Sequence, residues 1–164
     1  MREMLVYSAL KNYIHAKWPD VYIARKEDIN RDNVLAIHFR DLTPLRSMLN
    51  GRKYNGRTAG IQFVFQATQS DEDFYKNRTF LFCLEEYMNS LQNQYIVTET
   101  KYKFNEDDEP VEIDEPTEND KGVLIGIRST DLVTSVRELE KSPDGRPRFS
   151  INIAITYYIG GNKQ

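Results

Sequence analysis

Cysteine is almost absent from this 164-residue sequence, which contains only Cys83. A single cysteine cannot form an intrachain disulfide, so we expect a reducing compartment. Only two histidines accompany it, and a structural zinc site, which is built mainly from cysteine and histidine, is therefore not expected. The sequence also has no apolar run of about eighteen residues, and its first residues do not form a signal-peptide pattern. We therefore expect neither a membrane protein nor a secreted one.

The size and composition fit one folded domain. We expect a single domain over residues 1–164, because a compact chain of this length buries roughly 70% of its unfolded surface. Apolar residues make up 40% of the chain and aromatic residues 12%, which favours a folded globule over a disordered chain.

Acidic residues are concentrated in one segment. Residues 105–120 contain nine acidic residues and no basic one, so the rest of the chain has 22 basic and 16 acidic residues, a net charge of +6. Two prolines and only two apolar residues lie in this segment, so we predict a long acidic mobile loop over residues 105–121. Calcium binding is not expected, because the regular spacing of an EF-hand loop is missing. The acidic residues are Glu106, Asp107, Asp108, Glu109, Glu112, Asp114, Glu115, Glu118 and Asp120.

Basic residues are concentrated in a second segment. The chain has no acidic residue between Asp41 and Asp71, and turn dipeptides occur at Asn50-Gly51 and Asn55-Gly56. We therefore predict a basic loop, or a basic hairpin tip, over residues 44–58. For both charged segments, an ordinary solvated surface is the alternative interpretation. The basic residues are Arg46, Arg52, Lys53 and Arg57.

Two segments have helical periodicity. Apolar residues recur at helical spacing between Leu5 and Ile14, and Trp18-Pro19 ends this run. A second helix is predicted after Ser70, an N-cap residue followed by three carboxylates that oppose the positive helix end. Its wide apolar face indicates a helix buried on two sides or in contact with another subunit, and Cys83 is expected there as a small core residue. The predicted core stripe is Phe74, Leu81, Leu84, Met88 and Leu91, widened by Phe80, Cys83 and Tyr87.

Alternating patterns predict the strands. The strongest lies at residues 149–159, where every odd position is apolar, and Ser142–Gly145 before it forms a turn signal. The order of helix, strands, helix and strands predicts an α+β domain, with a largely antiparallel or mixed β-sheet and two main helices packed on one face. The other predicted strands are at residues 21–24, 34–39, 60–67, 95–100, 122–127 and 132–139.

No set of catalytic residues is apparent. The chain has no glycine-rich phosphate loop before a helix, no nucleophile elbow and no His-Glu-x-x-His motif. We therefore expect no enzymatic activity, no cofactor and no metal site. A small basic protein that binds DNA or RNA is the alternative function, because the four basic residues of segment 44–58 could neutralise several phosphates.

The order and character of four elements resemble the tail terminator proteins of tailed bacteriophages, also described as tail completion or minor capsid proteins. These elements are the N-terminal helix, the strand Gln-Phe-Val-Phe-Gln at residues 62–66, the helix after Ser70, and the closing strand at residues 148–158. The similarity covers about residues 1–160 and involves no catalytic residue. The acidic insertion between Lys103 and Lys121 is longer than the family pattern.

The resemblance implies a structural virion protein of the tail or neck, assembled in the host cytoplasm. In such proteins a homohexameric ring caps the tail tube and joins it to the head. The implied partners are the tail tube protein, head-completion or neck proteins and, in a contractile tail, the sheath; DNA passes through without specific binding. On this hypothesis Arg46, Arg52, Lys53 and Arg57 dock on an acidic surface of the tail tube or neck, and the acidic residues of segment 105–120 face the lumen or rim, where they repel DNA phosphates.

Overall fold

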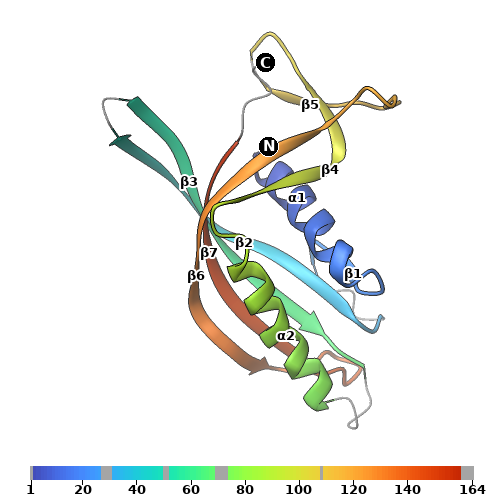
Figure 1. Cartoon of the computed structure of the whole chain (residues 1–164). Coiled ribbons are helices and arrows are strands. Elements are labelled where there is room, and N and C mark those ends of the chain that lie inside the picture. The colour runs from blue at the N-terminus through green and yellow to red at the C-terminus, as the bar shows by residue number, and fades with distance from the viewer. Residues whose placement is uncertain (1, 27–30, 50–51, 69–73, 108, 160–164) are drawn as a thin grey trace.

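The computed structural model describes residues 2–26, 31–49, 52–68, 74–107 and 109–159. Two helices and seven strands form one α+β fold (Figure 1). The fold class predicted from the sequence is confirmed: a mixed sheet, antiparallel in all pairs except one, lies beside two helices. The elements are α1 (Arg2–Lys17), β1 (Tyr22–Ala24), β2 (Val34–Leu49), β3 (Arg52–Gln66), α2 (Phe74–Asn89), β4 (Gln94–Phe104), β5 (Pro110–Glu112), β6 (Gly122–Leu139) and β7 (Arg148–Ile159).

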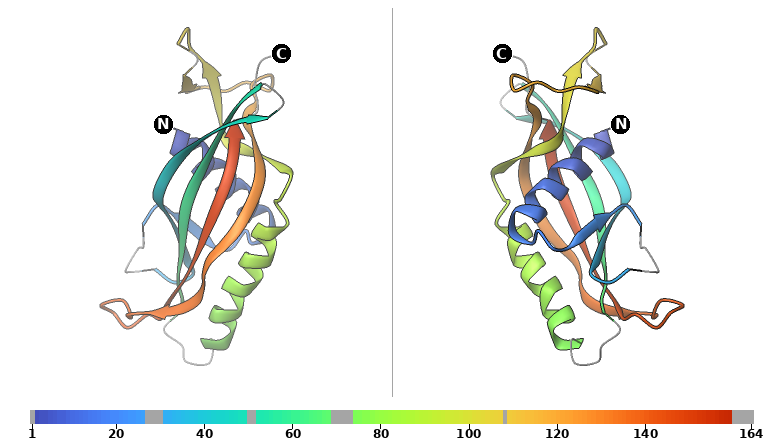
Figure 2. Two further views of the ribbon diagram at one scale, coloured as in Figure 1. Left: turned by 90° about the vertical axis from the view of Figure 1, so that its left-hand side faces the viewer. Right: turned by 90° about the vertical axis from the view of Figure 1, so that its right-hand side faces the viewer.

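The sheet has the strand order β1-β2-β3-β7-β6-β4-β5. β7, the strand with the clearest alternation in sequence, lies at its centre between β3 and β6. The short β1 pairs in parallel with the first residues of β2, where Ile23 lies opposite Leu35. Both helices cover the same face of the sheet, as Figure 2 shows from two sides. The opposite face carries no helix among the described elements.

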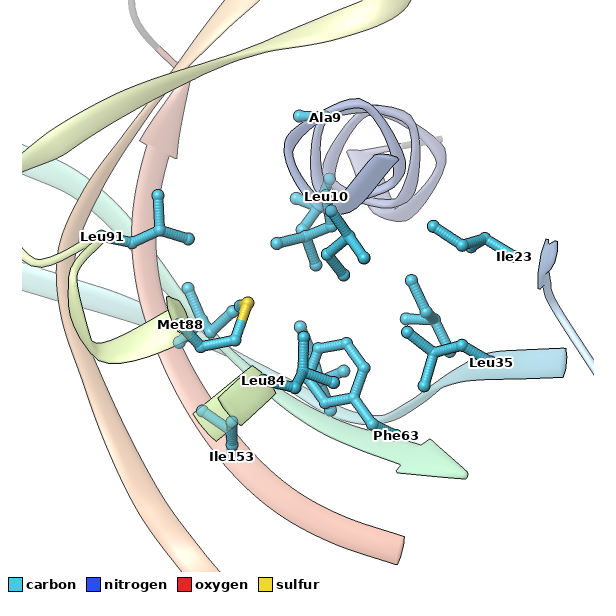
Figure 3. Close-up of a cluster of buried hydrophobic side chains, with 14 of the residues drawn as sticks. Ala9, Leu10, Ile23, Leu35, Phe63, Leu84, Met88, Leu91 and Ile153 are labelled. Carbon is cyan, nitrogen blue, oxygen red and sulfur yellow. The ribbon is translucent and has the colours of Figure 1, made fainter. Parts of the chain in front are cut away.

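The core lies between the two helices and the helix-covered face of the sheet (Figure 3). Phe63 of β3 is fully buried, and it lies opposite Ile151 of β7 in the ladder. Leu10 of α1 and Leu84 of α2 reach the same cluster. The odd positions of β3 and β7 therefore form the base of the core, as their alternation predicts.

Helix α2 buries a narrower face than the sequence suggests. Its stripe of Leu81, Leu84, Met88 and the following Leu91 is buried, whereas Cys83 is exposed. The prediction that Cys83 is a core residue is therefore wrong. A spacing of three, four and three residues keeps the stripe on one side, and Cys83 lies about 100° around the helix from Leu84. The side chain of Phe74 and the residues Ser70 to Asp73 lie outside the part that the structure describes.

The two helices are joined by a pair of stacked tyrosines. The ring centroids of Tyr13 in α1 and Tyr87 in α2 are 4.0 Å apart, and the planes differ by 6°. The Tyr13 hydroxyl donates to the carbonyl oxygen of Tyr87 at 2.9 Å, and the Tyr87 hydroxyl donates to the carbonyl oxygen of Tyr13 at 2.8 Å. Each phenol therefore donates a hydrogen bond to a main-chain carbonyl in the C-terminal part of the other helix, and the pair links the two helices.

This contact makes the free energy of unfolding depend on pH in the alkaline range. Burial, and then the neighbouring Tyr13 phenol, raise the pKa of Tyr87 to about 12. The folded protein therefore keeps a proton that the unfolded chain loses above about pH 10, so the free energy of unfolding falls between about pH 10 and 12. We expect Tyr87→Phe to reduce this fall in urea titrations from about pH 9 to 11. An equal slope in both proteins would contradict the assignment.

A bulge in β4 is held by the side chain of Ser8. The pairing of β4 with β6 shifts register between Val97 and Lys101. Within the bulge, the backbone N–H groups of Glu99 and Thr100 donate to the Ser8 hydroxyl at 3.1 and 3.2 Å. α1 thereby satisfies two donors that the sheet leaves unpaired, and the bulge redirects the outer part of β4.

Candidate interaction surface

The basic segment is part of an extended β-hairpin rather than a loop. β3 pairs with β7 only from Arg57 onward, whereas its pairing with β2 continues to the Leu49–Arg52 pair. Strand residues 45–49 and 52–56 therefore form a two-stranded extension beyond the sheet, which we call the ribbon (Figure 1). Of the two structures predicted for residues 44–58, the hairpin agrees with this pairing and the loop does not. Asn50 and Gly51 lie outside the described residues.

The register arranges three of the four basic residues on one face of the ribbon. Arg46 is opposite Asn55, and Lys53 is opposite Met48, two positions further along β2. Because strand faces alternate with a period of two, Arg46 and Lys53 share a face, and Arg57 belongs to it as well. Arg52 belongs to the other face. Spacing in the sequence alone does not reveal this grouping.

The acidic segment, predicted as a long acidic mobile loop over residues 105–121, contains one short strand, β5. β5 pairs with the end of β4, where Glu112 lies opposite Tyr102. The Asn105 side chain accepts hydrogen bonds from the N–H groups of Asp107 and Glu109, at 3.0 and 2.9 Å, and closes the turn between the strands. We call residues 101–121 the acidic hairpin. Asp108 lies outside the described residues.

A second turn completes the acidic hairpin. A carboxylate oxygen of Asp120 accepts a hydrogen bond from the N–H of Thr117 at 2.8 Å and another from its hydroxyl at 3.2 Å. Seven of the described carboxylates are exposed and Asp120 is partly buried. Thus the residues proposed for a lumen or rim are mostly at the surface. The exposed residues are Glu106, Asp107, Glu109, Glu112, Asp114, Glu115 and Glu118.

The two charged elements lie at the same end of the sheet and at opposite edges. The register pairs Arg57 of β3 with Tyr157, near the end of β7, and pairs Ile159 with Ile125, near the start of β6. β6 in turn starts beside the end of β4, which carries β5. Figure 2 shows the ribbon and the acidic hairpin projecting from this end. In the strand order, β2 is near one edge and β5 is at the other.

A patch of aromatic and apolar residues lies near this end on the sheet face without helices. The hydroxyls of Tyr95 and Tyr158 are 2.8 Å apart, and their rings meet edge to face at 6.1 Å between centroids. The Tyr158 ring covers Gly126, where an added Cβ would be 2.3 Å from the ring. Tyr95 is 59% exposed and Leu124 is 46% exposed. A hollow of about 380 Å³ borders the tyrosines and is lined by Asn93, Tyr95, Ile127, Arg128 and Tyr158.

This patch was not predictable from the sequence, because its members come from β4, β6 and β7 and meet only through the pairing of those strands. The only local signal is that Tyr158 breaks the small or polar pattern of the even positions in β7. The charged segments were identified because their residues are consecutive in the chain.

Neither a metal cluster nor a membrane span is found in the described part of the chain. In these ranges no three His, Cys, Asp or Glu side chains gather in a way that could hold a metal ion. No helix there is both long and apolar enough to cross a bilayer.

Comparison with known proteins adds no family to these observations. No protein-family model matches the chain, and no curated protein matches it in sequence.

Proposed function

We propose that this chain is a structural virion protein, a tail terminator that forms a ring on the tail tube and joins it to the head or neck. The proposal combines the resemblance in element order with one observation, the ribbon. A two-stranded hairpin is marginal by itself in water, and three strands or a packed layer are normally needed for stability. This ribbon continues past its last pairing with β7, so an external surface can supply the missing layer.

An assembly subunit accounts for the surface features without an active site. Ring subunits use two different, complementary surfaces, because each copy contacts one neighbour on either side. The partners on this proposal are further copies of the chain, the tail tube protein and head-completion or neck proteins. Binding of a cofactor or metal is not part of the proposal.

Nucleic-acid binding is the second candidate, and the ribbon favours it too. A two-stranded β-ribbon fits the major groove of DNA, and Arg46, Lys53 and Arg57 share one face. The acidic hairpin at the same end counts against this function, because its carboxylates repel phosphates. We therefore favour the tail terminator function over nucleic-acid binding.

The test is assembly of particles without this protein in the phage that would encode it. We expect DNA-filled heads and separate tails in electron micrographs of lysates, because the joining component is missing. Addition of the purified chain should restore joined, infectious particles. A chain bearing Lys26→Glu and Lys141→Glu, at exposed positions near the opposite end of the sheet, should restore them equally. Normal particles without the protein would contradict the proposal.

A further inference from the structure

We propose that copies of this chain associate head to tail, with the ribbon of one copy lying against the acidic hairpin of the next. The inference deepens the proposed ring function and rests on it for the closure of the ring. The contact itself can be tested on the purified chain. Its occupant is a second copy of the same chain, and the tail tube and DNA are the competing occupants.

Most of the outer edge of β2 is unpaired among the described residues. β1 pairs only with Val34 to Ala36, so the outer edge of β2 has no partner strand among the described residues from Ile37 to Leu49. Among the described residues, β3 likewise has no partner on its second edge from Arg52 to Gly56. Unpaired backbone donors and acceptors in such an edge readily pair with another chain. The ribbon therefore offers both strand edges to a neighbour.

The second step is charge complementarity within one chain. The ribbon and its base carry four basic residues and no acidic one, and the acidic hairpin carries nine carboxylates against three lysines at its base. Opposite charges across an interface raise the association rate and fix the register, whereas like charges meeting there cost several kcal/mol. A copy of this chain thus supplies the acidic surface that the ribbon requires.

The third step is placement. The ribbon and the acidic hairpin extend from the same end of the sheet, the ribbon from β2 and β3 and the hairpin from β4 and β5 on the other side of β7, so a neighbouring copy can bring its hairpin to the ribbon. That contact leaves the ribbon of one copy and the hairpin of the other free for further copies. Repeated head-to-tail contacts close into a ring when the rotation allows it, and otherwise form an open filament.

The experiment uses three charge-reversed variants. The ribbon variant carries Arg46→Glu, Lys53→Glu and Arg57→Glu, which changes the net charge of the ribbon and its base from +4 to −2. The hairpin variant carries Glu109→Lys, Glu112→Lys, Glu115→Lys and Glu118→Lys, which changes the net charge of the acidic hairpin from −6 to +2. The combined variant carries all seven substitutions. The molar mass of each protein is measured by light scattering after size-exclusion chromatography, at low and at high salt. We expect the wild type to form a multimer that high salt weakens, because exposed charges are screened.

The expected pattern follows from which surfaces match. The ribbon variant and the hairpin variant should each lose the multimer, because like charges meet at every contact. An equimolar mixture of these two should recover it, since each ribbon then finds a hairpin of opposite sign. The combined variant should assemble by itself. Recovery in the mixture also shows that both variants fold, and Lys26→Glu with Lys141→Glu should leave the multimer unchanged.

Other results overturn the contact. A wild-type chain that stays monomeric at its highest soluble concentration in low salt contradicts it, and so does a mixture that fails to recover the multimer. If the ribbon variant forms the wild-type multimer but no longer binds tail tubes, the ribbon docks on the tube instead. Salt-sensitive DNA binding that only the ribbon variant loses assigns the ribbon to nucleic acid. The proposed ring function can fail while the contact holds. In that case the multimers would show the expected charge dependence, but particles would assemble normally without the protein.

Discussion

Replacing Leu84 with alanine is expected to lower the free energy of unfolding by about 2–5 kcal/mol. Leu84 is fully buried on the inner face of α2, where it lies in the cluster of Met88, Phe63 and Ile153 (Figure 3). Its removal takes away apolar contacts and leaves a cavity that β3 and β7 cannot fill, because their pairing fixes their positions. Urea unfolding followed by circular dichroism measures the loss.

Phe82→Ala in the same helix is the matched control. Phe82 is 46% exposed and lies two residues before Leu84, so its removal should cost less than about 1 kcal/mol even though more atoms are lost. Equal losses for the two variants would mean that α2 packs on a different face. A loss of association in Phe82→Ala without a loss of stability would assign that face to a subunit contact.

Gly122→Ala is the second substitution with a large expected effect. A Cβ at Gly122 would lie 2.3 Å from the carbonyl oxygen of Thr98 and 2.9 Å from its hydroxyl oxygen. The Thr98 hydroxyl accepts a hydrogen bond from the N–H of Val123 at 2.8 Å, so the added methyl would displace backbone that is tied into the β4 bulge. We expect a loss of about 1–3 kcal/mol or more in thermal or urea unfolding.

Gly126→Ala serves as the comparison in the same strand. The nearest atoms to a Cβ there belong to the ring of Tyr158, a partly exposed side chain that can move, whereas at Gly122 the nearest atom is backbone. Gly126→Ala should therefore cost less than Gly122→Ala, and it should disturb the contact between Tyr95 and Tyr158. A smaller loss for Gly122→Ala than for Gly126→Ala would contradict the described geometry of the bulge.

The regular elements were largely predictable, because their patterns are local. The odd-position alternation in residues 149–159 and the helical spacing from Leu5 to Ile14 identified β7 and α1, and Gly145 adopts the φ of +85° that its turn signal requires. The full length of β2 was not predictable. Residues 40–49 lack apolar alternation, and their strand depends on pairing with β3, a long-range interaction that overrides local preference.

The candidate surface was predictable only in part. Runs of like charge identified Arg46 to Arg57 and Glu106 to Asp120 from the sequence, yet their position at one end and at opposite edges follows from the strand order. The patch of Tyr95 and Tyr158 was missed for the same reason. The exposure of Cys83 was not predicted either. Cys83 is next to Leu84 in sequence, and the apolar face predicted for the helix was wide enough to include both residues.

Electron microscopy of the purified chain mixed with tail tubes from its phage tests the central claim most directly. The account predicts a ring with a central opening, seated on one end of each tube. It also predicts that rings are lost with the ribbon variant and return when the hairpin variant is added in equal amount. Bare tube ends beside a chain that remains monomeric, in the same buffer and at the same concentration, would contradict the account.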